Sequence, residues 1–227
     1  MKTKLSFLVT ALVLIFSLTL SAIAAPVFTD VQYGSWYYDA VMYTAENEVM
    51  NGVVDDCFAP ETELTRAMVV TVLARLANAK TDVATTPSFE DVSFDTWYGL
   101  SVEWAKQNGI VKGVSETKFE PETNVTREQV CVMLSNFLDY LDLSTANTPK
   151  EDFADKDSIS SWAIDAVLRL QYAGIVNGQT EEIDGTEQYI FNPLGNTTRA
   201  EFAQIVYNSN LANVVDKSDD AKTQENA

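Results

Sequence analysis

The chain has 227 residues, 46% of them apolar, which is enough for one or two domains with a buried core. Its 33 acidic residues outnumber its 15 basic ones, and the resulting net charge of −18 argues against a nucleic-acid partner. Histidine is absent, which excludes Ser-His-Asp and Cys-His catalysis and histidine-ligated metal sites. No cofactor is expected.

The first 24 residues have the features of a secretory signal peptide. Lys2 and Lys4 form a basic start, residues 5–20 are uncharged and apolar, and small residues follow in the pattern of a signal-peptidase site. We expect cleavage after Ala24, because a cut one residue later would place Pro26 directly after it. The alternative is an uncleaved membrane anchor, since the apolar run is nearly long enough to span a bilayer. Cleavage would leave an exported chain with no transmembrane segment.

Five landmarks recur three times in one order along the rest of the chain. Each copy has a Phe-x-Asp tripeptide, a tryptophan eight or nine residues later, a glycine, a Phe-x-Pro tripeptide and a Thr-Arg pair. The copies keep an offset of 61 residues between the first and second, and the third carries about seven extra residues within 179–189. The recurring residues are Phe28, Phe89 and Phe153; Trp36, Trp97 and Trp162; Gly52, Gly113 and Gly178; Pro60, Pro121 and Pro193; and Thr65–Arg66, Thr126–Arg127 and Thr198–Arg199. This pattern indicates an internal repeat.

The repeats divide the chain into five segments. A signal peptide covers residues 1–24, and the three repeats cover 25–86, 87–148 and 149–215. The last segment, 216–227, is polar and lacks aromatic residues, so we expect it to be disordered.

Each repeat is predicted to form a helix, a loop and a second helix. Apolar or small residues recur at helical spacing after each tryptophan, and the glycine that follows suits a left-handed cap or a tight turn. Proline then favours an extended segment, and a second helix with one apolar stripe starts at each Thr-Arg pair. The stripes are Val69, Val72, Leu73 and Leu76; Val130, Met133, Leu134 and Phe137; and Phe202, Ile205 and Val206. No alternating strand is evident, so the fold class is predicted to be all-α.

The threonine of each Thr-Arg pair suits a helix N-cap. Thr198 and Thr126 begin capping boxes that Glu201 and Gln129 complete three residues later. Thr65 lacks this return contact, because the third helical position is methionine in the first repeat.

Capping does not explain the arginine, because a cation is unfavourable near the positive end of a helix dipole. Arg66, Arg127 and Arg199 beside free helix amides would each form a receptor for a carboxylate or phosphate. The alternative is that each arginine pairs with a nearby acid, such as Glu61, Glu122 or the aspartate of a Phe-x-Asp motif.

The repeats resemble S-layer homology domains. The Phe-x-Asp-Val opening, the Asn-Gly or Lys-Gly pair, the Phe-x-Pro and the Thr-Arg-Ala-Glu-like helix start carry this resemblance over residues 28 to about 211. It implies three copies packed as a pseudo-threefold prism around a central helical bundle, with a ligand groove between neighbouring copies. It also implies a non-covalent anchor that binds secondary cell-wall polysaccharide, often through a pyruvate ketal.

The resemblance also implies which residues form the grooves. The arginines would meet the anionic sugar, the tryptophans would line the grooves, the threonines would start the helices and the glycines would allow close approach. These glycan-binding residues are Arg66, Arg127, Arg199, Trp36, Trp97, Trp162, Thr65, Thr126, Thr198, Gly52, Gly113 and Gly178. The alternative for the tryptophans is helix packing.

Departures from the family pattern predict three unequal grooves. Met68 and Gln129 replace the usual glutamate, Lys156 replaces a valine, and the third loop is longer. We expect Arg199 to matter most, because only its motif keeps the complete Thr-Arg-Ala-Glu sequence.

Two further features have simple explanations. Cys131 lies in a helical stripe and Cys57 in a loop, and the sequence gives no reason for them to form a disulfide. Acidic residues crowd the third-repeat loop, where a solvated surface is favoured over a calcium site because the EF-hand spacing is absent; they are Glu181, Glu182, Asp184 and Glu187.

Three classes of function compete. The first is an exported, wall-associated module of the bacterial cell surface that binds an anionic wall polysaccharide. The second is a structural adaptor of the envelope that binds other surface proteins. The third is a wall-modifying enzyme with paired carboxylates, as in glycosidases. We do not expect an enzyme, because the repeats occupy nearly all of the mature chain and no spaced acid pair stands out.

Overall fold

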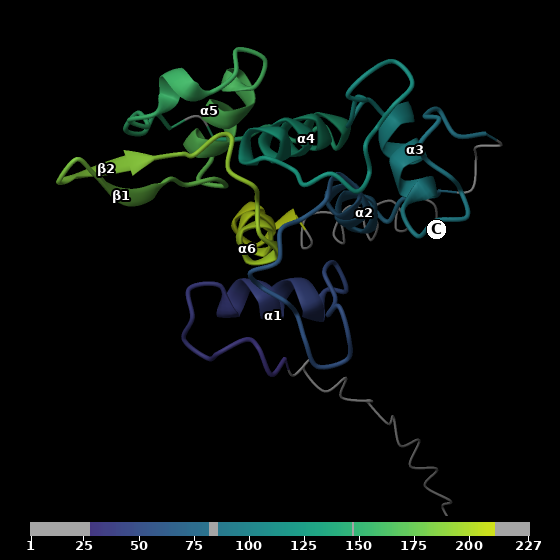
Figure 1. The fold of residues 1–227 in the computed structure, drawn as a ribbon, viewed down its shortest axis with the longest axis horizontal. Coiled ribbons are helices and arrows are strands. Elements are labelled where there is room, and N and C mark those ends of the chain that lie inside the picture. The colour runs from purple at the N-terminus through teal and green to yellow at the C-terminus, as the bar shows by residue number, and fades with distance from the viewer. Residues whose placement is uncertain (1–27, 82–85, 147, 212–227) are drawn as a thin grey trace, which may run out of the picture.

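The computed structural model of the protein describes residues 28–81, 86–146 and 148–211 (Figure 1). The predicted signal peptide at 1–24 and the predicted disordered tail at 216–227 lie outside these residues. The described elements, in chain order, are α1 (Tyr38–Glu46), α2 (Arg66–Leu76), α3 (Gly99–Gln107), α4 (Arg127–Tyr140), the 3₁₀ helix η1 (Lys156–Ser158), α5 (Ile164–Tyr172), β1 (Gln179–Ile183), β2 (Thr186–Ile190) and α6 (Arg199–Ser209). Each repeat therefore supplies two helices, and the third repeat also supplies two strands.

The all-α prediction is wrong, because the extra residues of the third repeat form a β-hairpin. Strands β1 and β2 pair antiparallel, from Gln179 opposite Ile190 to Ile183 opposite Thr186. At the tip, Asp184 and Gly185 have φ angles of 52° and 75°, and positive values at both positions are what a two-residue hairpin turn requires. The chain is therefore a mixed α and β fold. The Asp-Gly pair was the local signal for this hairpin, and helical periodicity elsewhere could not reveal it.

The helices pair between repeats rather than within them. Helix α3 packs on α2 of the preceding repeat, and α5 packs on α4 in the same way. The first helix, α1, packs on the last, α6, as Figure 1 shows. The two ends of the described chain are thereby joined, and the three pairs form a closed arrangement.

A ring of three hydrogen bonds joins the loops that lead into the second helices. The amide of Leu64 donates to the carbonyl of Thr197 at 2.8 Å, Thr197 donates to Val125 at 3.0 Å, and Val125 donates back to Leu64 at 2.9 Å. All three residues are fully buried. Each repeat thus supplies one donor and one acceptor, so the ring cannot close unless all three repeats are present.

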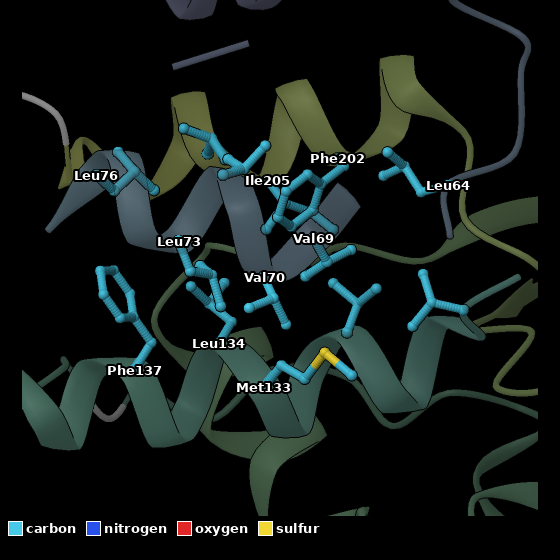
Figure 2. Close-up of a cluster of buried hydrophobic side chains, with 14 of the residues drawn as sticks. Leu64, Val69, Val70, Leu73, Leu76, Met133, Leu134, Phe137, Phe202 and Ile205 are labelled. Atoms are coloured by element: carbon cyan, nitrogen blue, oxygen red, sulfur yellow. The ribbon is translucent and has the colours of Figure 1, made fainter. Parts of the chain in front are cut away.

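The second helices meet in the core beside this ring (Figure 2). Their apolar stripes face one another, and the side chains are almost completely buried because each stripe is covered by residues from the other helices. Prominent members are Val69, Val70, Leu73 and Leu76 of α2; Met133, Leu134 and Phe137 of α4; and Phe202 and Ile205 of α6. The predicted stripes are therefore confirmed as core.

Replacing Thr197 by valine is expected to stabilise the fold. The Thr197 hydroxyl is buried and has no hydrogen-bond partner among the described residues, whereas the equivalent ring residues are Val125 and Leu64. Removing an unsatisfied buried hydroxyl while keeping the side-chain shape should raise the free energy of unfolding by about 1 kcal/mol. Urea denaturation followed by circular dichroism measures this change. The reverse substitution, Val125→Thr, is the matched control and should destabilise the protein.

A fragment that ends at Thr148 is not expected to fold. Without the third repeat, α1 loses its partner α6, α4 loses its partner α5, and the ring of hydrogen bonds cannot close. The apolar faces left exposed should cause aggregation or a molten state. Size-exclusion chromatography and thermal unfolding of residues 25–148 test this, and a cooperative monomer would contradict the closed arrangement.

Candidate ligand-binding grooves

The helix caps form as the sequence predicts. The hydroxyl of each N-cap threonine accepts a hydrogen bond from the amide of the third helical residue, in α2, α4 and α6 alike. The return contact is also present where the sequence provides it, from Gln129 to Thr126 and from Glu201 to Thr198. These caps fix the first turn of each second helix, and with it the position of the arginine that follows the threonine.

The other amides of these helix starts are not free, which removes part of the predicted anion receptor. The amides of Arg66 and Ala67 donate to the carbonyls of Thr123 and Pro121 in the next repeat. The same pair of bonds recurs at α4 and α6, so each helix start docks onto the loop of a neighbouring repeat. What the helix start offers to a ligand is therefore the guanidinium group, not backbone amides.

Each arginine crosses to the next repeat and holds two backbone carbonyls there. Nε of Arg66 donates to Phe119 at 2.8 Å, and Nη2 donates to Lys112 at 3.1 Å. Arg127 and Arg199 contact the equivalent carbonyls, and all three guanidinium groups lie 4.5–5.2 Å from the centre of the motif phenylalanine ring. Arg127 donates to the carbonyls of Phe191 and Asn177. Arg199 donates to those of Phe58 and Asn51. The arginines are thus part of the junction between repeats.

The three arginines differ in their ion pairs. Nη1 of Arg127 lies 3.0 Å from Oε1 of Glu201, the glutamate of the complete capping box. Among the described residues no carboxylate lies within ion-pair distance of Arg66 or Arg199. Desolvation lowers the pKa of both, and is opposed only by more distant acids such as Glu120 near Arg66. The alternative given above, a pairing of each arginine with an acid such as Glu61, Glu122 or a motif aspartate, is not found among the described residues, where only Arg127 has an acidic partner, Glu201.

The motif aspartates have a structural role that the sequence reasoning missed. Asp91 accepts hydrogen bonds from the amides of Phe119 and Glu120, at 2.9 and 2.8 Å. Glu120 has a φ of 58°, so the carboxylate stabilises a left-handed residue directly before a proline. Asp30 and Asp155 make the same pair of bonds in their repeats. The recurrence of the aspartate in all three copies was the available signal.

The motif glycines are required by close packing rather than by a left-handed conformation. The left-handed residues after the first helices are Glu48, Gly109 and Gly174. At Gly113, a Cβ atom would lie 2.4 Å from the carbonyl oxygens of both Ser115 and Lys118. Gly52 and Gly178 are equally confined by backbone oxygens and a phenylalanine ring. Of the two explanations given for these glycines, the left-handed cap is not found, and each glycine instead lies where the chain folds closely on itself.

The tryptophans of the repeats are exposed. Trp36, Trp97 and Trp162 expose 62%, 58% and 58% of their surface, whereas the fourth tryptophan, Trp104, is buried. Helix packing, the alternative given above, does not account for three exposed indoles at equivalent positions. Trp36 and Trp97 each pack edge-on against the next tyrosine, Tyr37 and Tyr98, which holds the ring at the surface.

Two cavities bring these residues together. One, of about 780 Å³, is lined by Arg66, Gly113, Gln129 and Trp162 among others. The second, of about 410 Å³, is lined by the equivalent set, Trp36, Arg127, Gly178 and Glu201. In each cavity one repeat supplies the glycine and the helix, the preceding repeat supplies the arginine, and the following repeat supplies the tryptophan. We call them the Arg66 groove and the Arg127 groove.

Arg199 and Gly52 lie at the third equivalent junction, whereas Trp97 lines neither of the two grooves. At the third junction Arg199 donates to the carbonyl of Asn51, next to Gly52. Met68 takes the place of Gln129 and Glu201, and Arg75 takes the place of the asparagines that line the other two grooves. This junction thus carries two arginines and no acid among these positions, which makes it chemically distinct from the other two.

Both cysteines are free thiols, and they do not form a disulfide. Desolvation raises the pKa of the buried Cys131 to about 12, so it is an inert core residue at neutral pH. Among the described residues no group of three or more acidic or cysteine side chains is arranged to hold a metal ion, and no helix is long and apolar enough to cross a membrane.

Comparison with known protein families shows which family the three repeats match. The model of the S-layer homology domain matches residues 27–67, 88–131 and 152–203, once in each repeat. The chain belongs to the S-layer homology domain family. This confirms the resemblance inferred from the motifs.

Curated relatives carry the same repeats within longer proteins. An amylopullulanase of Thermoanaerobacterium thermosulfurigenes is 31% identical over 79% of the chain, and an endoglucanase of a Bacillus species is 30% identical over 79%. An S-layer protein of Bacillus anthracis is 29% identical over 82%. The chain spans only 9%, 18% and 21% of the lengths of these relatives. The family and its S-layer relatives identify a cell-surface protein that is associated with the cell wall.

The aspartate contacts predict a pH-dependent stability. Desolvation raises the pKa of Asp91, but hydrogen bonds from the amides of Phe119 and Glu120 outweigh it, so the pKa lies below the usual 3.8. A carboxyl group whose pKa is lower in the folded state than in the unfolded state stabilises the protein at any pH above its unfolded-state pKa. This stabilisation is lost as the pH falls through the folded-state pKa. Asp91→Asn should therefore lower the melting temperature at pH 7, and the difference from the wild type should shrink towards about pH 3.

Thermal unfolding of both proteins between pH 7 and pH 3 checks this. The exposed Asp95 offers a matched control, because Asp95→Asn removes the same charge from a side chain that makes no hydrogen bond to another described residue. A constant difference across the pH range would contradict the assigned role of Asp91.

Proposed function

We propose that the chain attaches non-covalently to the bacterial cell wall by binding secondary cell-wall polysaccharide, pyruvylated in its acidic units, in the grooves between repeats. The observation that carries this proposal is the pairing, in each of two equivalent cavities, of an exposed tryptophan with an arginine whose side chain is mostly covered. An exposed indole ring that lines a cavity beside a guanidinium group can contact a ligand bound there.

The chemistry of the grooves suits a sugar with an acidic substituent. An indole ring offers an apolar face to a pyranose ring, while Gln129 and Asn136 in the Arg66 groove offer polar groups to hydroxyls. The guanidinium group is suited to a carboxylate such as that of a pyruvate ketal. The overall charge of −18 would repel an anionic polymer at long range, but charges are screened beyond about 8 Å at physiological salt, so the local groove dominates.

The proposal assigns anchoring and no catalysis to the chain. Several relatives are named as glycan-degrading enzymes, but the chain matches a minor part of their length, and that part is the repeats. The described residues are taken up by the three repeats and contain no separate catalytic domain.

Binding to purified sacculi tests the proposal. The protein should sediment with intact sacculi and remain in solution once the secondary polysaccharide has been removed from them. Equal sedimentation with stripped sacculi would contradict glycan binding and favour the envelope adaptor instead.

Tryptophan variants should separate binding from folding. Trp162→Ala and Trp36→Ala are expected to reduce sacculus binding about tenfold or more, because an aromatic platform is lost from each cavity. Both side chains are mostly exposed, so the melting temperature should change little.

The control is Tyr33→Ala, which removes an aromatic ring that is 89% exposed and lines neither groove. It should leave both binding and stability unchanged. Loss of binding in proportion to lost folded protein would instead mean that the tryptophans act only in packing.

A further inference from the structure

A buried glutamate on α4 holds the segment that carries Trp162. Glu128 exposes only 2% of its surface. Its Oε2 accepts a hydrogen bond from the amide of Ser160 at 2.9 Å, and its Oε1 accepts one from the Ser160 hydroxyl at 2.8 Å. Both bonds cross from the second repeat to the third, where α5 packs on α4 (Figure 1). We call this pair of bonds the Glu128 clasp.

The helix start does not by itself require this glutamate. Glu128 is the second residue of α4, and the equivalent residues of α2 and α6 are Ala67 and Ala200. Burying a carboxylate costs free energy that its hydrogen bonds must offset, and among the described residues no basic group lies within ion-pair distance of Glu128. The contribution of Glu128 therefore lies in what it holds, which is Ser160.

Ser160 begins the turn that presents Trp162 to the Arg66 groove. The carbonyl of Ser160 accepts hydrogen bonds from the amides of Ala163 at 2.8 Å and Ile164 at 3.2 Å, which closes the turn around Trp162. Ala163 is fully buried, whereas Trp162 is mostly exposed and lines the groove. The position of the indole ring thus depends on the backbone on either side of it, and the clasp fixes the side that precedes it.

The other two exposed tryptophans are supported in a different way. Trp36 and Trp97 pack edge-on against the tyrosine that follows each of them, with ring centres 5.2 and 5.1 Å apart. The residue that follows Trp162 is alanine, and within the described part of the chain no other aromatic ring packs against Trp162. The tryptophan that lacks a supporting ring is therefore the one whose turn is held by the clasp.

We propose that Glu128 is a positioning residue for the Arg66 groove, where it acts through Ser160 to hold Trp162 in place before a ligand arrives. Glu128 lines neither groove, so it acts only through this contact. The inference rests on the proposed glycan binding and adds the residue that prepares one wall of the groove. A side chain that is already ordered in the free protein loses less conformational entropy on binding, which raises the affinity.

Three substitutions weaken the clasp to different degrees. Glu128→Ala removes both bonds and introduces the residue that α2 and α6 have at this position. Ser160→Ala removes only the bond from the hydroxyl and leaves α4 unchanged, so it tests the same contact if Glu128→Ala does not fold. Glu128→Gln is the conservative variant, because its amide group can accept from the Ser160 amide and donate to the Ser160 hydroxyl oxygen.

Glu103→Ala is the matched control. Glu103 is also buried, and it accepts from the amide and the hydroxyl of Ser88 at 2.7 and 2.8 Å, with a third bond from Gln107. This substitution removes a clasp of the same chemistry at the start of the second repeat, outside both grooves. An effect that appears in Glu128→Ala and not in Glu103→Ala is therefore not a general loss of stability, which thermal unfolding of each variant measures.

The order parameter of the Trp162 indole N–H, measured by ¹⁵N relaxation without ligand, reports the positioning. The chain has four tryptophans, and Trp162→Phe identifies the signal. The order parameter should be about 0.85 in the wild type, as for rigid backbone, and below about 0.6 in Glu128→Ala. We expect an intermediate value in Ser160→Ala, a value close to the wild type in Glu128→Gln and no change in Glu103→Ala.

Sacculus sedimentation measures the consequence for binding. The Trp36→Ala background removes the aromatic wall of the Arg127 groove, so that binding depends on the Arg66 groove. In this background Glu128→Ala should weaken binding about three- to tenfold, which corresponds to the entropy of ordering one side chain. Glu103→Ala should not weaken it.

An unchanged Trp162 order parameter in Glu128→Ala and Ser160→Ala, or an equal loss of order in Glu103→Ala, would overturn the inference. So would a mobile Trp162 that leaves sacculus binding unaltered. If the wild type binds sacculi and the order parameter does not respond, anchoring stands and the positioning role is wrong. If the order parameter responds but the wild type does not bind sacculi, Glu128 positions Trp162 and the anchoring proposal is wrong.

Discussion

The hydrogen bonds among Leu64, Val125 and Thr197 are the constraint on which the rest of the structure depends. They join loops that are up to 133 residues apart and bring the three second helices to one centre. Once that centre is fixed, each first helix can cover only the second helix of the preceding repeat, and α1 must reach α6. Closing the chain costs conformational entropy, which the shared apolar core offsets only when the arrangement is complete.

The arginines connect this architecture to binding. Each one crosses a junction and holds the loop that carries the motif glycine, and Arg66 and Arg127 also line a groove. Stability and binding are therefore coupled at these residues, and an arginine variant by itself cannot separate them. The exposed Trp36 and Trp162 are better probes, because they line the grooves without holding the loops together.

Sequence patterns correctly predicted the features that depend on interactions between residues close together in the chain. The threonine caps and the apolar stripes of α2, α4 and α6 depend on residues within a few positions of one another. The hairpin was not predicted although Asp184 and Gly185 suit its turn, because β1 and β2 are mostly exposed and so have no alternating apolar face. The close packing around Gly113 could not be predicted for a different reason: it comes from carbonyls that approach only after the loop has folded back.

The sequence by itself determined the number of repeats, their helix starts and the family, because these follow from spacing and short-range capping. Only the tertiary structure decided which residues share a groove. The arginine, the glycine and the tryptophan of one cavity come from three different repeats, so no linear motif contains a whole site. The pairing of Arg127 with Glu201, 74 residues later, likewise follows from how the repeats dock. Docking is set by the closed ring and the core, which act through space rather than along the chain.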